Sequence, residues 1–240
     1  MMTRGGFWLV GAIVALFLVG CGGSGSSSLP KPMVRVINAS PDSTALDFLV
    51  DDETLGSAII PLGSSPDFAA VDSGDRDVVI LENGTTIQLV AEVQNFEDDR
   101  NYLIVALGLK LFGTEDLKRL RALTLQVDRT IPNGNKARLY VVHAYNRKVG
   151  FLTPNIDFQT PGDNPLFQIP NMAFGTQTSI LVDSGAVTYE ARRAGTTSVL
   201  ASATTTLGAG KIYAVIVGGI EDEAPPKNPT ITFIEVAARS

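Results

Sequence analysis

The chain contains two copies of one unit, and this repeat constrains its fold more than any other feature. Residues 71–108 match residues 182–219 at a constant offset of 111, without a gap. A period of about 110 residues is too long for a solenoid and predicts tandem domains. Upstream the match is looser. The matching landmarks are Val71-Asp72-Ser73-Gly74 with Val182-Asp183-Ser184-Gly185, Gly84 with Gly195, Tyr102 with Tyr213, Gly108 with Gly219, Asn38-Ala39 with His143-Ala144, and Asp47-Phe48 with Asp157-Phe158.

Each unit has the residue pattern of β-strands. Residues 34–37 and 139–142 are short β-branched or apolar runs that end in turn formers, and residues 87–94 alternate between apolar and polar side chains, with Val90 the one exception. Such alternation is typical of a half-buried strand. The continuous apolar runs at 102–107 and 212–217 predict central strands buried on both faces. The spacing of these strands predicts an all-β fold of two tandem Ig-like antiparallel β-sandwich domains.

The repeat also sets the expected domain boundaries. We expect one sandwich at residues 34–128, a linker at 129–135, and a second sandwich at 136–240, each folding independently. One short helix is predicted at Thr114–Leu120, because Thr114 can cap it and acidic residues precede basic ones.

The first 20 residues are typical of a secretory signal peptide. Arg4 precedes an apolar run at 7–19, which would reach only about 20 Å as a helix, too short for a bilayer. Cys21 follows, and it is the only cysteine of the chain. A glycine- and serine-rich spacer makes residues 21–33 a flexible linker. The alternative is an ordinary secreted protein with one leftover thiol.

The run Leu18-Val19-Gly20-Cys21 resembles the lipobox of bacterial lipoproteins. This resemblance implies cleavage before Cys21, a diacylglyceryl group with palmitate-type chains on its thiol, and a membrane anchor. Two or more acyl chains anchor a protein stably. Gly22, rather than Asp, follows the cysteine, which favours the outer membrane as the location in the cell envelope, either facing the periplasm or the cell surface.

The charge balance argues against nucleic-acid binding. The chain has 25 acidic and 19 basic residues, and the basic ones form no cluster. Cys21 is the only cysteine and Trp8 is the only tryptophan. The folded body therefore has no disulfide, and its stability depends on aliphatic packing and sheet hydrogen bonds.

The segment Val34-Arg35-Val36-Ile37-Asn38-Ala39-Ser40-Pro41-Asp42 resembles the opening of a bacterial envelope domain of unknown function, family four-three-nine-seven. Gly210-Lys211-Ile212-Tyr213 resembles its closing strand, and the resemblance covers residues 34–237. The second copy departs from the motif, because Ala144-Tyr145-Asn146-Arg147 replaces Ala-Ser-Pro-Asp. The family implies secretion, tandem β-domains and often lipid anchoring, with no established activity.

Four residues of the motif region could form the rim of a ligand site. They are Asn38, Ser40, Asp42 and Asp47. The structural interpretation is stronger, because Asp and Ser side chains at such positions bond nearby backbone and shape the turns between strands. Tyr102 and Tyr213 leave a similar choice between a sugar-stacking platform and a tyrosine corner, and their repetition favours the structural role.

No motif of an enzyme or a metal site occurs. The acidic runs Asp51-Asp52-Glu53, Asp98-Asp99 and Glu221-Asp222-Glu223 lack the alternating spacing of a calcium loop, and His143, the only histidine, lies in no catalytic motif. We therefore expect no enzyme activity, catalytic residue, metal or cofactor. The expected function is adhesion or envelope architecture through protein or polysaccharide partners. The alternative is a carbohydrate or other ligand receptor that uses its inter-strand loops.

Overall fold

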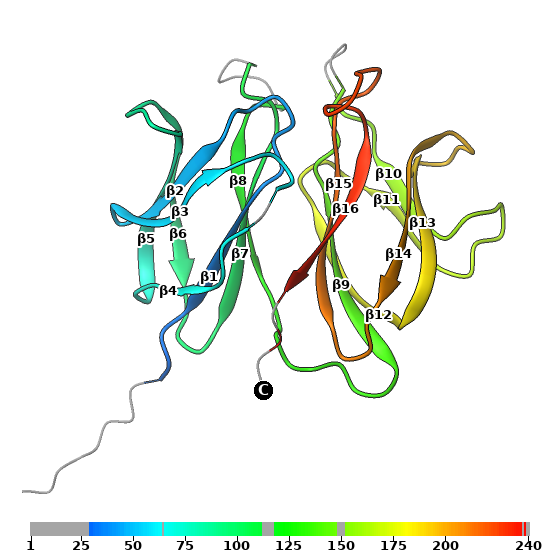
Figure 1. Ribbon diagram of the computed structural model, residues 1–240, viewed down its shortest axis with the longest axis horizontal. Coiled ribbons are helices and arrows are strands. Elements are labelled where there is room, and N and C mark those ends of the chain that lie inside the picture. Colours follow the sequence, from blue (N-terminus) through cyan, green and yellow to red (C-terminus); the bar gives the residue numbers. More distant parts are fainter. Residues whose placement is uncertain (1–28, 64, 112–117, 148–151, 237, 239–240) are drawn as a thin grey trace, which may run out of the picture.

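The protein is all-β in its computed structural model, which describes residues 29–63, 65–111, 118–147, 152–236 and 238 (Figure 1). Sixteen strands and no helix occur in these ranges. Within the same residues, no helix is long and apolar enough to cross a membrane. The predicted signal peptide, Cys21 and most of the predicted helix at Thr114–Leu120 lie outside them. The described end of that segment, Lys118 to Leu120, is a turn and a single β-bridge.

The first domain is a sandwich of two four-stranded sheets. The inner sheet has the order β4-β1-β7-β8, and the outer sheet has the order β3-β2-β5-β6. All neighbouring strands are antiparallel except β1 and β7. The strands are β1 (Met33–Asn38), β2 (Leu46–Val50), β3 (Glu53–Ile59), β4 (Ala69–Ala70), β5 (Gly74–Glu82), β6 (Gln88–Phe96), β7 (Asn101–Leu107) and β8 (Arg121–Gln126).

The second domain repeats this arrangement strand for strand. Its inner sheet is β12-β9-β15-β16 and its outer sheet is β11-β10-β13-β14, with β9 and β15 as the parallel pair. The two β-sandwiches predicted from the repeat are confirmed, although each inner sheet is mixed rather than purely antiparallel. The strands are β9 (Lys136–His143), β10 (Ile156–Gln159), β11 (Gln168–Met172), β12 (Gln177–Asp183), β13 (Gly185–Arg193), β14 (Val199–Leu207), β15 (Ile212–Gly218) and β16 (Thr230–Val236).

Each domain has its own core between its two sheets. Phe48, Phe96 and Tyr102 are buried together in the first domain, and Phe158 stacks on Tyr189 in the second. Burial alternates along the outer strands, as in β6, because a pleated strand turns every second side chain toward the core. The period-two pattern predicted a half-buried strand correctly but not its core face: Val90, the exception to the pattern, is buried, whereas Ile87 and Val93 are 55% and 64% exposed.

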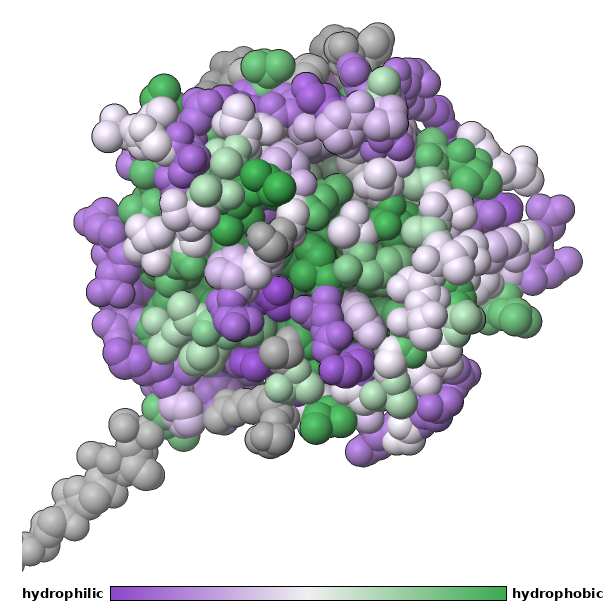
Figure 2. Space-filling model, viewed as in Figure 1, coloured by the Kyte–Doolittle hydropathy of each residue, from purple (hydrophilic) through white to green (hydrophobic). Residues whose placement is uncertain are grey.

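A third core lies between the two domains. The inner sheets pack face to face, which gives four sheet layers side by side in Figure 1. In β7, Leu103 and Val105 face the second domain, while Ile104 and Ala106 face the first domain's own core. The strands β7 and β15 are buried at every residue, as their continuous apolar runs predicted. On the face seen in Figure 2, hydrophobic residues gather near the middle, where the two domains meet.

Polar contacts also connect the domains. The Arg35 guanidinium donates to the carbonyl of Glu235 (2.7 Å), and the N–H of Asp128 donates to the Tyr140 hydroxyl (2.6 Å). Arg121 lies 4.9 Å from the centre of the Phe174 ring. The sequence led us to expect two independent folding units. The structure differs in that the two domains share a hydrophobic core with hydrogen bonds around it.

The N-terminal segment and the motif lie at opposite ends of the first domain. The N–H of Asp99 donates to the carbonyl of Pro30 (2.7 Å), and the N–H of Met33 donates to that of Arg100 (2.9 Å). From there β1 runs the length of the inner sheet to Asn38. We call the end with Pro30 and Arg100 the tether end, and the end that holds residues 39–45, the motif loop, the motif end (Figure 1).

Candidate functional site

The motif loop is organised around Asn38, the last residue of β1. Asn38 is 1% exposed, and its amide group donates to the carbonyl of Ile59 (2.9 Å) and the hydroxyl of Ser43 (3.0 Å). Its side-chain oxygen accepts the N–H of Ser40 (3.0 Å), which forms an Asx-type turn. The donors and acceptors of Asn38 are therefore bound within the protein.

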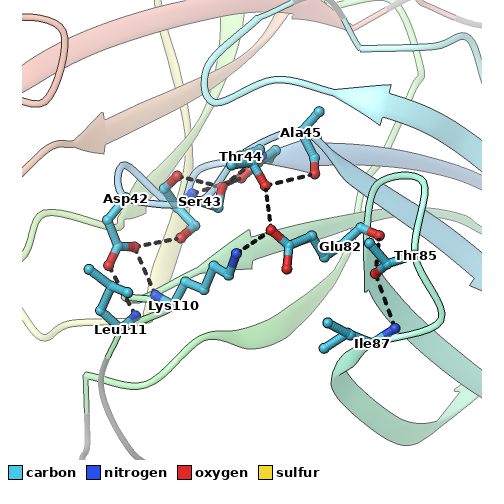
Figure 3. Close-up of polar contacts among 11 residues, drawn as sticks. Asp42, Ser43, Thr44, Ala45, Glu82, Thr85, Ile87, Lys110 and Leu111 are labelled. Atoms are coloured by element: carbon cyan, nitrogen blue, oxygen red, sulfur yellow. Dashed lines mark hydrogen bonds and ion pairs between the residues drawn. The ribbon is translucent and has the colours of Figure 1, made fainter.

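Asp42 ties the motif loop to the segment after β7 (Figure 3). Its carboxylate accepts the N–H of Lys110 (2.8 Å) and the N–H of Leu111 (3.2 Å), and the hydroxyl of Ser40 donates to it (3.3 Å). Ser40 is fully buried. The sequence predicted a local turn here, whereas the main bonds of Asp42 reach a loop 68 residues further along the chain.

An ion pair between Lys110 and Glu82 extends this network (Figure 3). The hydroxyl of Thr44 also donates to Glu82 (3.2 Å). The hydrogen bond from Lys110 is the largest of the effects that lower the pKa of Glu82. Glu82 ends β5, so the pair joins the outer sheet to the loop that leaves the inner sheet.

Asp47 lies outside this network and holds two other turns. Its carboxylate accepts the N–H of Ala58 (2.8 Å), the side-chain amide of Asn83 (2.8 Å), the hydroxyl of Ser57 (2.8 Å) and the N–H of Gly84 (3.3 Å). Burial alone would raise its pKa, but these four donors outweigh burial and lower it. The four predicted site residues therefore form two groups: Asn38, Ser40 and Asp42 together, and Asp47 apart.

Asp157, the counterpart of Asp47 in the second domain, makes the same kind of contacts. Asp157 accepts the N–H of Asn171 (2.7 Å) and the N–H of Gly195 (3.0 Å), which occupy the places of Ala58 and Gly84. Ala58 and Asn171 both have positive φ, 55° and 54°, so each aspartate holds an unfavourable backbone conformation in place. Asp47 and Asp157 thus have the same structural role.

The ion pair beside Asp42 is present in the second domain with reversed charges, and the backbone contacts of Asp42 are replaced there by a further ion pair. Arg147, Arg193 and Glu221 occupy the positions of Asp42, Glu82 and Lys110. Arg147 lies 2.8 Å from Glu221, and Arg193 forms a second ion pair with it. This reversal is readable from the repeat, since the offset of 111 aligns Glu82 with Arg193 and Lys110 with Glu221, although the motif residues alone do not indicate it.

His143 takes the place of Asn38 in the second domain. It is fully buried, its Nε2 lies 3.0 Å from the carbonyl of Pro154, and Phe174 packs against it edge to face. Burial lowers its pKa to about 4, so the imidazole is neutral at pH 7. Among the described residues, its Nδ1 has no hydrogen-bond partner. The ring is therefore packed inside the second domain in its neutral form.

Tyr102 and Tyr213 form equivalent corners at the tether end. The N–H of Glu97 donates to the Tyr102 hydroxyl, and the N–H of Gly208 donates to the Tyr213 hydroxyl, both at 3.0 Å. The two residues are 6% and 9% exposed. The prediction that they are buried anchors whose hydroxyls meet the backbone is confirmed.

A small cavity of about 170 Å³ lies near the motif end, lined by Lys118, Arg121, Leu152, Thr153 and Phe174. Among the residues that the structure describes, no three His, Cys, Asp or Glu side chains lie close enough to hold a metal ion. A polar cavity of about 460 Å³ lies at the tether end, lined by residues 99–101 and 126–130. None of the four predicted site residues lines either cavity.

Comparison with known proteins supports the family resemblance. Residues 32–149 match the model of a family described as Domain of unknown function (DUF4397). No curated protein matches the chain. The matched residues include the first domain and β9 of the second. The family description names no activity, so the arrangement of the residues has to carry any functional argument.

Proposed function

We propose that this chain, half of which resembles a family without an assigned activity, is a non-catalytic, lipid-anchored module of the cell envelope. Its function would be adhesion or envelope architecture, with the outer membrane as its location. In this proposal Cys21 carries the lipid, and the motif ends of the two domains contact another envelope protein. No metal or cofactor takes part.

The observation that carries the proposal is the direction of the first strand. The N-terminal segment is held at the tether end by backbone hydrogen bonds and by an ion pair of Lys31 with Asp72 (2.7 Å). From there β1 leads directly to the motif loop at the far end. A lipid on Cys21 would therefore place the tether end toward the membrane and the motif end away from it.

The length of the intervening chain sets the reach of the module. Pro30 lies nine positions after Cys21, and an extended chain of nine Cα–Cα steps spans at most about 30 Å. The six residues of β1 add about 20 Å to the motif loop. The motif end would then lie within roughly 50 Å of the bilayer surface, a suitable distance for a partner in the same envelope.

The motif itself supports a structural rather than a catalytic role. The polar atoms of Asn38 and Asp42 are bound to other groups of the protein, which leaves no activated nucleophile or base among them. A partner would therefore recognise the surface contour of the motif loop rather than free polar groups. Leu111, bonded to Asp42 through its N–H, is 80% exposed beside that loop and offers an apolar contact.

Site-specific photo-crosslinking in native envelopes tests both parts of the proposal. A photoreactive residue would replace Leu111 at the motif end or Arg100 at the tether end, in the natural chain and in Cys21→Ser. We expect membrane partitioning and a protein adduct from position 111 in the natural chain. Cys21→Ser should lose both, because acylation and anchoring require the thiol.

Other outcomes of the same experiment would reject parts of the proposal. Unchanged membrane partitioning of Cys21→Ser would remove the lipid anchor. A polysaccharide adduct at position 111 would favour the receptor alternative. Adducts from position 100 alone would show that the tether end, rather than the motif end, contacts the partner. As a matched control, Ser24→Ala changes the spacer without changing the acylated residue.

A further inference from the structure

The strand β12 is an open sheet edge that the first domain does not have. It pairs only with β9 and continues for seven residues, whereas its counterpart β4 has two. Among the described residues, no other strand pairs along its free edge. An exposed regular edge offers unpaired N–H and C=O groups to another chain, and proteins usually block such edges.

The first domain blocks the equivalent edge with a long connection. Its β3–β4 connection spans residues 60–68, compared with residues 173–176 in the second domain. The N–H of Leu62 donates to the carbonyl of Asn38 (2.8 Å), and the Ser65 hydroxyl donates to that of Val36, so this connection covers the side of β1. Among the described residues of the second domain there is no such cover, because its shorter connection leads straight into β12.

Two hydrogen bonds show which backbone groups of β12 face outward. The N–H of Ser184 donates to Asn135 (2.9 Å), and the N–H of His143 donates to Thr176 (3.1 Å). Bonded and unbonded residues alternate in an antiparallel ladder. The even-numbered residues of β12 therefore bond to β9, and the N–H and C=O of residues 177, 179, 181 and 183 point away from the sheet.

The side chains of β12 do not discourage pairing. Residues 177–182 carry no charge, and Asp183 is paired with Lys136 (2.7 Å). Leu181 is 50% exposed and borders an apolar groove of about 330 Å³. Three other edge strands are protected: β6 contains Glu92, β11 contains Pro170, and the uncharged β14 lies against β16.

We propose that β12 is the contact surface for a second copy of this chain. The two β12 strands would pair antiparallel about Ile180, which joins the two inner sheets into one eight-stranded sheet. This register places Ser179 opposite Leu181 of the second copy, with the outward backbone groups of both hydrogen-bonded. It also places Gln177, an amide donor, opposite the Asp183 carboxylate of the second copy.

A second copy fits this edge better than an unrelated strand for two reasons. The strand is complementary to itself in this register, since no like charges meet and Gln177 meets Asp183. A two-fold contact also satisfies both edges at once and closes the assembly, as in most soluble homodimers. The proposal does not depend on the lipid anchor or on the motif loops.

Sedimentation velocity on the full-length chain in detergent tests the proposal. We expect a monomer–dimer equilibrium in the natural chain. Leu181→Lys should weaken dimerisation at least about 10-fold, because the two-fold axis brings two lysines onto diagonal positions. The matched control Ser202→Lys adds the same charge to β14 and should leave the equilibrium unchanged. A natural chain that stays monomeric, or equal weakening by both variants, would overturn the proposal.

Cysteine substitution tests the register in the same preparation. Ile180→Cys should give a disulfide-linked dimer, because residue 180 faces itself in an unbonded pair with Cα atoms about 4.5 Å apart. Thr178→Cys should not, since its two copies would lie about 13 Å apart. The natural chain shows the background from Cys21. Crosslinking at 178 but not at 180 would reject this pairing.

Discussion

One position in each domain shows how a single residue can be replaced by a chemically different one. Asn38 ends β1 with its amide bonded to the motif loop and to Ile59, whereas His143 ends β9 as a buried ring with one bonded nitrogen. Both fill a closed space at the motif end. The replacement gives the second domain a titratable group that the first domain lacks.

We predict that His143 makes the protein less stable as the pH falls from 7.5 to 5. Its folded-state pKa is about 4, below the ordinary value of 6.5. Between these values the unfolded chain binds a proton that the folded protein does not, so the free energy of unfolding decreases as pH falls. The expected loss from pH 7.5 to 5 is about 2 kcal/mol, measured by urea unfolding.

The variant His143→Asn, which copies the first domain, provides the control. Because the chain has one histidine, this change removes the only imidazole. The comparison uses the slope of stability with pH, so a constant loss of stability in the variant does not matter. An unchanged slope between pH 7.5 and 5 would show that His143 is not the group responsible.

At the residue level, the sequence predicted the roles of Tyr102 and Tyr213 because each follows a turn and opens an apolar run. It predicted less well what Asp42 does. The carboxylate bonds to Lys110 and Leu111, and no local pattern indicates which distant loop will lie beside a motif. Contacts between loops depend on strand pairing, which has to be known first.

At the level of elements, the two motif ends have the same ion pair with opposite charges. Lys110 pairs with Glu82 in the first domain, and Glu221 pairs with Arg193 in the second. Exposed ion pairs contribute little to stability, but these side chains are mostly buried. The arrangement suggests that complementarity between the charges matters, while their absolute sign does not.

We predict that reversing both charges in the first domain is tolerated better than reversing one. Lys110→Glu brings together three carboxylates and should cost about 1 kcal/mol of unfolding free energy. Adding Glu82→Arg should recover at least half of that loss. Urea unfolding at low salt measures both. If the double variant is less stable than Lys110→Glu, the two sites are not equivalent.

An exposed pair of the same charges provides the control. Lys211 and Glu235 are paired across β15 and β16 with about half of each side chain exposed, 52% and 50%. Reversing Lys211 should change stability less than reversing Lys110, because solvent screens this pair more strongly. A larger effect at Lys211 would contradict the argument from burial.

The strands themselves were predictable, since alternation and apolar runs are local signals. The parallel pairing of β1 with β7 was not, because the two strands are far apart in the sequence and neither encodes its partner. The repeat added information of another kind. Once the pairing is known, the offset of 111 transfers Glu82 and Lys110 onto Arg193 and Glu221.

At the level of the whole molecule, the shared core decides how the domains behave. Val105 and Ile216 face each other's domains and are completely buried. The apolar runs indicated that β7 and β15 are covered on both sides, but a sequence pattern does not say what covers them. The cover proved to be the other copy of the same unit.

We predict that cutting the linker does not separate the domains. A protease site inserted between Gly134 and Asn135, both exposed, should give two fragments that still elute together. The shared hydrophobic core holds them without a covalent link. Size-exclusion chromatography after cleavage measures this. Separate elution under native conditions would restore the expectation of two independent units.

A charge in the shared core gives the matched comparison. Val105→Glu places an unpaired carboxylate between the inner sheets, where its burial is costly. The cut fragments of this variant should separate. The equivalent change at Val93, which is 64% exposed on β6, should leave them together.

The way β1 enters the fold also determines how the molecule would respond to mechanical force. A pull on the N-terminal segment acts along the axis of β1, whose six residues pair in parallel with Asn101–Ala106 of β7. Such a load shears these pairs, so their hydrogen bonds resist together rather than opening one after another. The corresponding strand of the second domain, β9, is not pulled directly, because the chain reaches it only after passing through the first domain. The first domain, where the chain enters, would therefore be the part that withstands tension, and the second domain the part that it carries.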